Sequence, residues 1–212
     1  MKTIFRIFTT ISILTIVLIA IFGYKVFFKS NTSFNQDFVY VYVNSGSSAD
    51  DMISSISSYI IDIESFIKAA KTKKYLENIK AGRFIIHKGD GNNKIINSLR
   101  SKNIPLNITF NNIQTIQEFS GFISKKIEAD STSLIESFTD VTFLKSLNLS
   151  EESVLSLFLP NTYEFFWNTS ADNFREKMVN EFNIFWNENR VDKAKKIGLN
   201  PCLLYTSDAA DE

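Results

Sequence analysis

Hydrophobic residues are densest at the start of the chain. Eighteen residues without a charge, IFTTISILTIVLIAIFGY, lie between Arg6 and Lys25. This length is near the roughly 20 apolar residues that cross the hydrocarbon core of a bilayer. The stretch at its exit, GYKVFFKS, has bulky residues where a cleaved signal peptide would have small ones. The pattern therefore favours an uncleaved transmembrane anchor within residues 1–30, and a cleaved signal peptide is the alternative.

The residues that flank this anchor bear on its orientation. Lys2 and Arg6 precede the span and Lys25 and Lys29 follow it, so the distribution of positive charge hardly decides the orientation. A short tail before the span and a large polar region after it favour a cytoplasmic N-terminus. We therefore expect a single-pass protein whose bulk is translocated across the membrane.

The period of the hydrophobic pattern changes after residue 37. Residues 38–44 alternate strictly, as a strand does, and apolar residues then recur at helical spacing from 52 to 60. A second helix over about 62–78, a strand in GRFIIH, a helix capped by Asp90 and a strand in IPLNITF follow. The order β-α-α-β-α-β predicts one small α+β module over residues 38–111, of a size suited to gripping a polymer.

Helices predominate in the rest of the chain. Thr115 and Glu118 have the spacing of a capping box, and a long amphipathic helix is predicted over 171–190. Between these helices, residues 162–167 alternate as a strand does. Residues 112–201 therefore predict a second, mixed α/β region, and the chain as a whole is expected to be of the α+β class.

The composition argues against several kinds of partner and binding site. The 23 basic and 23 acidic side chains give a formal net charge of zero, so no basic excess is available for a nucleic-acid backbone and no nucleic-acid partner is expected. The single cysteine, Cys202, and the single histidine, His87, exclude an intramolecular disulfide and the usual Cys/His zinc sites. Nothing in the sequence suggests nucleotide or pyridoxal chemistry, so neither a metal nor a cofactor is predicted.

One carboxylate, Glu164, stands in the aromatic stretch FLPNTYEFFW, residues 158–167. A carboxyl group that is buried among aromatic rings is easier to keep protonated than to ionise, and a protonated carboxyl can act as a general acid. Strand alternation, however, points Glu164 away from Tyr163 and Phe165. Glu164 is therefore either a proton donor or a strand residue that faces water.

Three stretches occur together in a familiar order. They are KAGRFIIHKGDGNNKIINSLRS, NITFNNIQTIQEFSGFISKKIEAD and LFLPNTYEFFWNTSADNFREKM. From about Val39 to Pro201 the chain resembles the YceG-like family, the endolytic murein transglycosylases called MltG. The resemblance implies one N-terminal transmembrane helix, a LysM-like module over 38–111 and the first part of a catalytic domain over 112–201.

The resemblance also implies a function. Such proteins cut the glycan strands of nascent peptidoglycan between N-acetylmuramic acid and N-acetylglucosamine, and they leave 1,6-anhydro ends. The implied location is the cell inner membrane, with a cytoplasmic N-terminus and a periplasmic bulk. The implied partners are the glycan strands and the membrane. No cofactor is implied.

A single acid suffices for this reaction, whereas ordinary glycosidases need two carboxylates. The C6 hydroxyl of the substrate itself attacks the anomeric carbon. The candidate general acid is Glu164, which matches a residue that is frequent in the family, and the candidate substrate-binding residues are Asn161, Thr162 and Tyr163. In the alternative interpretation, Glu164 is a solvated strand residue and Asn161 and Thr162 shape the backbone turn.

The chain departs from the family pattern at the position of the usual catalytic acid. Many members read Glu-Gly-x-Leu-x-Pro-Asp-Thr-Tyr, in which the first Glu is that acid. Alignment on Pro160 puts Leu155 and Ser156 in place of the Glu-Gly pair, and the nearest acids before the proline are Glu151 and Glu152.

The end of the chain departs as well. After IGLNP the family would continue through further catalytic sequence, but here CLLYTSDAADE follows. We expect residues 202–212 to be a non-native tail on a truncated chain. The leading prediction is thus a membrane-anchored transglycosylase in incomplete form. The alternatives are a module that binds peptidoglycan without cutting it, an inactive fragment, and a tethered scaffold for cell-wall synthases.

Overall fold

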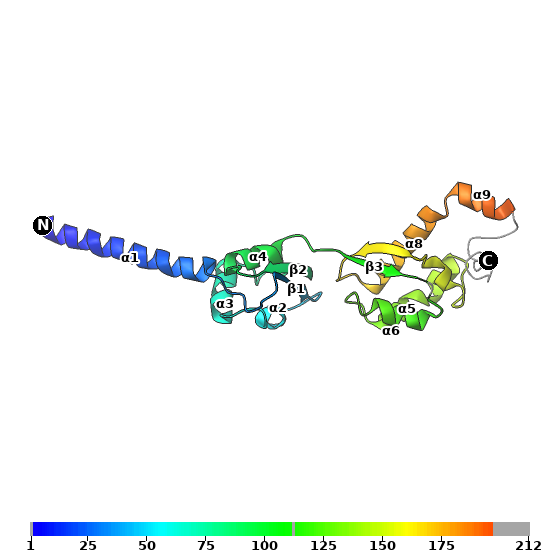
Figure 1. Cartoon of the computed structure of the whole chain (residues 1–212), viewed down its shortest axis with the longest axis horizontal. Coiled ribbons are helices and arrows are strands. Elements are labelled where there is room, and N and C mark those ends of the chain that lie inside the picture. Colours follow the sequence, from blue (N-terminus) through cyan, green and yellow to red (C-terminus); the bar gives the residue numbers. More distant parts are fainter. Residues whose placement is uncertain (1, 112, 197–212) are drawn as a thin grey trace. The chain divides into compact units, whose positions relative to one another are not determined.

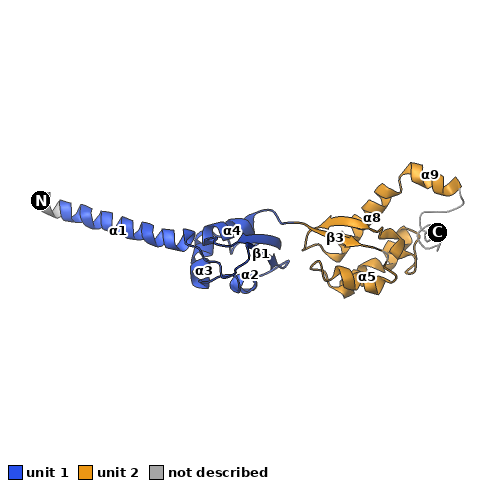
Figure 2. Ribbon diagram, viewed as in Figure 1, with its two compact units in different colours: residues 1–104 blue, residues 105–212 orange. Residues whose placement is uncertain are grey.

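The structure, a computed structural model, describes residues 2–111 and 113–196 and confirms the α+β class. It divides into two compact units, residues 1–104 and residues 105–212, and each unit has its own hydrophobic core (Figure 2). The tail that was predicted to be non-native, residues 202–212, lies outside the described residues.

The first unit begins with the long helix α1 (Lys2–Phe28), shown in blue in Figure 1. Its segment Arg6–Phe28 is 23 residues long and apolar enough to cross a membrane. At about 1.5 Å per residue this segment extends for about 34 Å, slightly more than the hydrocarbon core of a bilayer at about 30 Å. The predicted anchor segment is therefore a helix of sufficient length and composition to span a membrane.

The rest of the first unit is an antiparallel pair of strands with three short helices. Its elements are β1 (Phe38–Val43), α2 (Ala49–Ser57), α3 (Ile63–Thr72), β2 (Gly82–His87) and α4 (Asn92–Arg100). Strand alternation puts Val41 and Val43 in the core, where they pack with Phe84 and Ile86 of β2. The helices bury their apolar faces against this ribbon.

The local sequence signals in this unit place the helix starts to within a residue or two. The expected helix at residues 62–78 begins as predicted, with the Asp62 carboxylate accepting a hydrogen bond from Ser65, but α3 ends at Thr72. Lys74 has a φ of 53°, and the chain turns there. The prediction that Asp90 caps the next helix is wrong, because the N-cap residue of α4 is Gly91. The Asp90 carboxylate instead accepts a hydrogen bond from the backbone N–H of His87.

The turn after α3 directs the Tyr75 ring into the core, where it has no exposed surface. Among the described residues the Tyr75 hydroxyl has no hydrogen-bond partner. Burial raises the pKa of Tyr75 to about 12 from 10.0. The free energy of unfolding is therefore expected to fall as the pH rises from 10 towards 12, by about 1.4 kcal/mol per pH unit, because the unfolded chain loses this proton first.

Tyr75→Phe isolates this effect, because it removes only the hydroxyl group. Below pH 10 we expect the variant to match the parent within about 1 kcal/mol, because the lost hydroxyl makes no hydrogen bond in the described structure. Between pH 10 and 12 its free energy of unfolding should fall less steeply than that of the parent. Urea unfolding of both proteins at a series of pH values across this range measures the difference. Equal slopes for the two proteins would contradict the assignment.

The second unit combines a second antiparallel ribbon with helices. Its elements are β3 (Leu106–Phe110), α5 (Ile116–Ile123), α6 (Ser131–Phe138), α7 (Val141–Ser146), the 3₁₀ helix η1 (Val154–Leu157), β4 (Asn161–Phe165), α8 (Ala171–Phe185) and α9 (Glu188–Lys196). Thr115 caps α5 by accepting a hydrogen bond from the Glu118 N–H, and Ser170 caps α8 in the same way. The long helix predicted to reach residue 190 is interrupted after Phe185.

The pairing of β3 changes the expected division of the chain. The sequence pattern assigned this strand to the module over 38–111, but it pairs with β4, more than 50 residues later in the chain, in the register Leu106↔Phe165 to Phe110↔Asn161. The first unit closes at Ile104, whose N–H donates to the carbonyl of Arg83 in β2. The boundary between the two units therefore lies between residues 104 and 105. Strand β3 belongs to the second unit because it forms hydrogen bonds with β4, and a local sequence pattern contains no information about this distant pairing.

Candidate functional site

The β3–β4 ribbon has one apolar face and one polar face. Ile108, Phe110, Tyr163 and Phe165 are buried in the core of the second unit. The alternate residues point outward and are exposed. They are Asn107, Thr109, Thr162 and Glu164, and we call them the polar face of the ribbon.

The polar face brings together residues that are far apart in the sequence. Asn107 lies opposite Glu164, and Thr109 lies opposite Thr162. The two threonine hydroxyl oxygens are 2.7 Å apart and share a hydrogen bond. Sequence reasoning identified Thr162 and Glu164 but missed Asn107 and Thr109. The alternation in LNITF contained the signal, but the pairing partner of that strand was unknown.

Glu164 also borders a pocket of about 290 Å³, and its side chain is exposed. Lys177 of α8 donates a hydrogen bond to the Glu164 carbonyl oxygen, and its ammonium lies 4.9 Å from the centre of the Phe165 ring. The aromatic neighbours of Glu164 in sequence do not enclose it, in agreement with strand alternation. The other residues that line the pocket are Pro105, Phe165, Phe166, Thr169 and Asn173.

This arrangement offers groups of the kind that bind carbohydrate. The pocket and the polar face supply a carboxylate, an ammonium, amides and hydroxyls, and the Phe166 ring is 48% exposed. Hydroxyl and amide groups on a sugar need such donors and acceptors, and an exposed ring offers apolar surface to the C–H face of a pyranose. The groups of the polar face are therefore accessible from solvent.

Asn161, Thr162 and Tyr163, the three predicted substrate-binding residues, differ in their exposure to solvent. Tyr163 is only 6% exposed, and its hydroxyl donates to the Leu159 carbonyl oxygen at 2.8 Å. Its ring stacks on Phe110 with 5.4 Å between centroids. Asn161 and Thr162 are exposed, and the Asn161 side chain accepts a hydrogen bond from the Thr162 N–H. Asn161 and Thr162 are therefore accessible to a ligand, whereas Tyr163 holds the ribbon against the core.

The residues at the position of the usual family acid, Leu155 and Ser156, contribute to packing in this chain. Leu155 packs against the core from η1, and Ser156 is buried with its hydroxyl donating to the Ser153 carbonyl oxygen at 2.7 Å. Glu151 and Glu152 lie in the preceding turn and are exposed. No side chain at position 155 or 156 can donate a proton from a carboxyl group.

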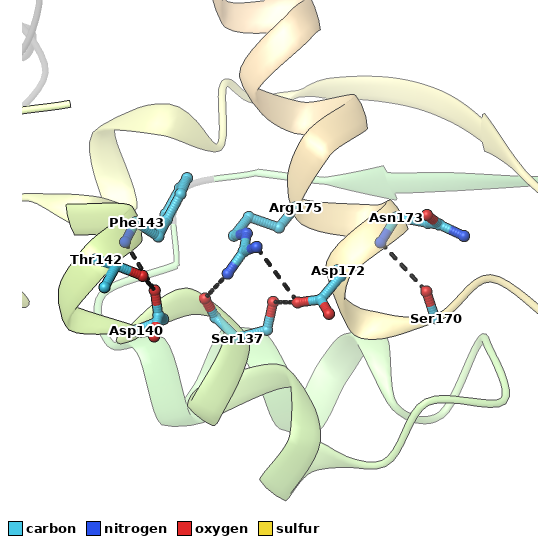
Figure 3. A network of polar contacts seen from close by, with 8 residues as sticks. All are labelled: Ser137, Asp140, Thr142, Phe143, Ser170, Asp172, Asn173 and Arg175. Carbon is cyan, nitrogen blue, oxygen red and sulfur yellow. Dashed lines mark hydrogen bonds and ion pairs between the residues drawn. The ribbon is translucent and has the colours of Figure 1, made fainter. Parts of the chain in front are cut away.

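A polar network beneath the ribbon fixes α8, the helix that supplies Asn173 and Lys177. The Ser137 hydroxyl donates to Asp172 at 2.7 Å, and Arg175 donates to the Ser137 carbonyl oxygen at 2.6 Å (Figure 3). Arg175 also pairs with Asp172 at 3.4 Å. These contacts link α8 to α6 and thereby set the position of the residues that line the pocket.

The same region contains the cap of α7. The Asp140 carboxylate accepts hydrogen bonds from the Thr142 hydroxyl and from the Phe143 N–H (Figure 3). These two hydrogen bonds, the first more than the second, hold the pKa of Asp140 below its usual range.

Within residues 2–111 and 113–196, no group of three or more His, Cys, Asp or Glu side chains is arranged to hold a metal ion.

Comparison with known proteins identifies the family. The sequence profile of the YceG-like family matches residues 41–207, so the chain belongs to the YceG-like family. A search of curated proteins finds no match. Among solved structures, the 2.6 Å crystal structure of a Listeria monocytogenes protein described as YceG-like matches with a TM-score of 0.43 and 17% sequence identity. The match covers 79% of this chain and 61% of that one, so the chain spans less than two thirds of the length of that relative.

Proposed function

We propose that the protein is a membrane-anchored endolytic murein transglycosylase that cleaves nascent peptidoglycan strands and leaves 1,6-anhydro ends. Its helix α1 lies in the cell inner membrane with the N-terminus in the cytoplasm, and both units are in the periplasm. The observation that carries this proposal is membership of the YceG-like family over residues 41–207. The helix Arg6–Phe28 and the accessible polar face of the ribbon support it independently.

In the proposed reaction, a glycan strand lies across the polar face with a glycosidic oxygen at Glu164. Glu164 donates its proton to the O4 atom of N-acetylglucosamine while the C1–O4 bond breaks. The C6 hydroxyl of N-acetylmuramic acid attacks C1, the C1–O6 bond forms, and the hydroxyl proton passes to the Glu164 carboxylate. No water enters the products, so one carboxyl acts first as acid and then as base.

Glu164 is exposed in the free protein, and a sugar strand that covers the ribbon excludes water from its carboxyl group. In this proposal Asn107, Thr109 and Thr162 bind hydroxyl or acetamido groups of the glycan near the scissile bond, and Asn161 lies at the end of the ribbon. Tyr163 supports them from the core side.

Product analysis tests the proposal. The chain, and a version that carries the C-terminal region of a family member, are each incubated in membranes with uncrosslinked glycan strands. We expect 1,6-anhydro-ended fragments from the extended version, detected by mass spectrometry as products 18 Da lighter than hydrolysis would give. Reducing-end products would indicate ordinary hydrolysis, and strands of unchanged length would contradict both forms of cleavage.

Leu155 and Ser156 favour a second candidate function, because they replace the usual acid of the family. In this alternative the periplasmic part holds glycan without cutting it. Residues 31–196 should then sediment with purified peptidoglycan, and the Thr109→Ala/Thr162→Ala double variant should be retained less. Retention without cleavage by the extended version would favour this alternative over the enzyme. Recovery of cell-wall synthases without glycan would instead favour a scaffold.

A further inference from the structure

The junction between α1 and the first unit has no flexible spacer. Val26 and Phe27, in the last turn of the helix, pack against the core of the first unit, and α1 ends beside α3 and α4 (Figure 1). The apolar segment Arg6–Phe28 therefore runs directly into folded structure. A simple tether would instead leave the last turn exposed and end in a polar linker.

Two buried side-chain amides close this junction. Asn31 is 5% exposed and Asn92 is 1% exposed. The Asn31 amide donates to the Asn92 side-chain oxygen at 2.8 Å and to the Asp62 carbonyl oxygen at 2.9 Å, and its own oxygen accepts from the Asp62 N–H at 2.7 Å. The Asn92 amide donates to the Val26 carbonyl oxygen of α1 at 2.8 Å and to the Ser65 hydroxyl at 3.0 Å. The helix end is thus tied to the starts of both α3 and α4.

Backbone contacts complete the junction. The Asn31 N–H donates to the Asp90 carbonyl oxygen at 3.0 Å, and Ser30 and Gly91 form an antiparallel bridge. At Gly91 a Cβ atom would lie 2.8 Å from the Phe28 carbonyl oxygen and 2.9 Å from that of Lys29. Only glycine allows this approach. Buried and fully hydrogen-bonded contacts of this kind hold one geometry.

The geometry of the junction has a consequence for the membrane surface. Ser30 and Asn31 follow Phe28 by two and three residues in non-helical chain, so they lie within about 10 Å of the end of the apolar segment. If α1 crosses a bilayer, the surface around these residues faces the lipid headgroups. Ile61 belongs to that surface, because its N–H donates to the Asn31 carbonyl oxygen at 3.1 Å, and its side chain is 68% exposed. Lys25 and Lys29 are exposed on the same segment.

We propose that this junction is a rigid joint that seats the first unit directly on the bilayer crossed by α1, with Ile61 in the interfacial layer and Lys29 at the lipid phosphates. An exposed isoleucine is unfavourable in water but stable among the first carbons of the acyl chains, and a lysine next to a span reaches the phosphates by extending its stem. The occupant of this surface is the bilayer, because the surface is continuous with the spanning helix. The inference rests on the proposed membrane anchor but not on the proposed enzymatic activity.

Site-directed labels test the joint in the full 212-residue chain. In a Cys202→Ser background, single cysteines at positions 18, 61 and 44 carry the same nitroxide, and the protein is reconstituted in mixed phosphatidylcholine and phosphatidylglycerol vesicles. Position 18 lies in α1 and reports insertion. Position 44 follows β1 at Val43, the end of the β1–β2 ribbon opposite the Phe38↔His87 end that adjoins the joint. We expect collisions with a water-soluble nickel chelate at position 61 to be about fivefold fewer than at position 44.

Each outcome of this experiment has a defined meaning. Protection at 18 with equal exposure of 61 and 44 overturns the joint and leaves the anchor intact. Exposure at 18 overturns the anchor and the joint together. Protection at 61 that disappears when the protein is diluted into excess lipid reveals a second copy as the occupant, and this also overturns the proposal.

A variant in which the first unit is no longer held rigidly to the spanning helix distinguishes two explanations for protection at position 61. One is the rigid joint, and the other is a local affinity of Ile61 for lipid. Insertion of Gly-Ser-Gly-Ser between Lys25 and Val26 leaves the contacts of Val26 and Phe27 with the first unit in place but separates that unit from the spanning part of α1. We expect position 61 to become as exposed as position 44 while position 18 stays protected. Continued protection at 61 would overturn the joint. Hydrogen exchange of the α3 and α4 amides verifies that the inserted variant remains folded.

Discussion

Replacing Glu164 by glutamine is expected to lower the rate of anhydro-product formation by about 10²- to 10⁴-fold in the extended protein, the usual contribution of a general acid. Glutamine keeps the shape and hydrogen-bonding reach of the side chain but cannot release a proton. Because Glu164 is exposed and makes no packing contribution to the core, the substitution should leave the fold and the affinity for glycan nearly unchanged. The expected signature is therefore a loss in kcat with little change in KM.

Two further substitutions make the result decisive. Glu136→Gln is the matched control, because Glu136 is an exposed acid on α6 in the same unit, and its activity should stay within about twofold of the parent. Glu152→Gln tests the nearest acid before Pro160. Undiminished turnover in Glu164→Gln would remove Glu164 from the mechanism. A selective loss in Glu152→Gln would place the proton donor in the turn before η1 instead.

Phe119→Ala is expected to lower the free energy of unfolding of the second unit by about 3–5 kcal/mol, the range found when a buried phenylalanine is truncated. Phe119 is 1% exposed. Its ring lies 4.4 Å from Phe158 and 4.9 Å from Phe110, measured between centroids, and it also contacts Phe138 and Phe174. Its removal leaves a cavity at the centre of this aromatic cluster, which neighbouring rings cannot fill without leaving their own contacts.

Tryptophan fluorescence reports this loss selectively, because both tryptophans, Trp167 and Trp186, belong to the second unit. Phe166→Ala is the control, because that ring is 48% exposed, and the expected loss is below about 1 kcal/mol. The first unit has a separate core with no shared residues, so hydrogen exchange of its helices should not change. Loss of protection in both units would show that they do not fold independently.

Local sequence signals accounted for much of the fold. The uncharged run before Lys25 specified a helix of spanning length, because an isolated apolar segment can satisfy its backbone only within itself. Alternation in residues 162–167 put Tyr163 and Phe165 on one face and Glu164 on the other, and the structure shows that the first face is buried and Glu164 is exposed. Asp62 and Ser170 marked helix starts, because a side-chain oxygen before a helix accepts one of the free N–H groups.

The errors arose where distant residues decide the structure. The predicted cap Asp90 holds the His87 turn instead and leaves Gly91 at the helix start, where the end of α1 leaves no space for a Cβ atom. The predicted helix over 171–190 ends at Phe185, and Phe182, Phe185 and Trp186 near its end are only half-buried. A periodic pattern shows which face of a helix is apolar, but not how much of the core reaches it.

The sequence by itself determined most of the helices and strands, the apolar helix of spanning length, the family, and the opposite faces of Tyr163 and Glu164, because each depends on neighbouring residues or on a motif read along the chain. Only the tertiary structure decided that β3 pairs with β4, that Asn107 and Thr109 lie beside Glu164 and Thr162, and that Asn92 binds both Asn31 and the end of α1. These contacts join residues 51 to 66 positions apart. Closing such loops costs entropy that only the packed cores repay, so a local pattern carries no record of them.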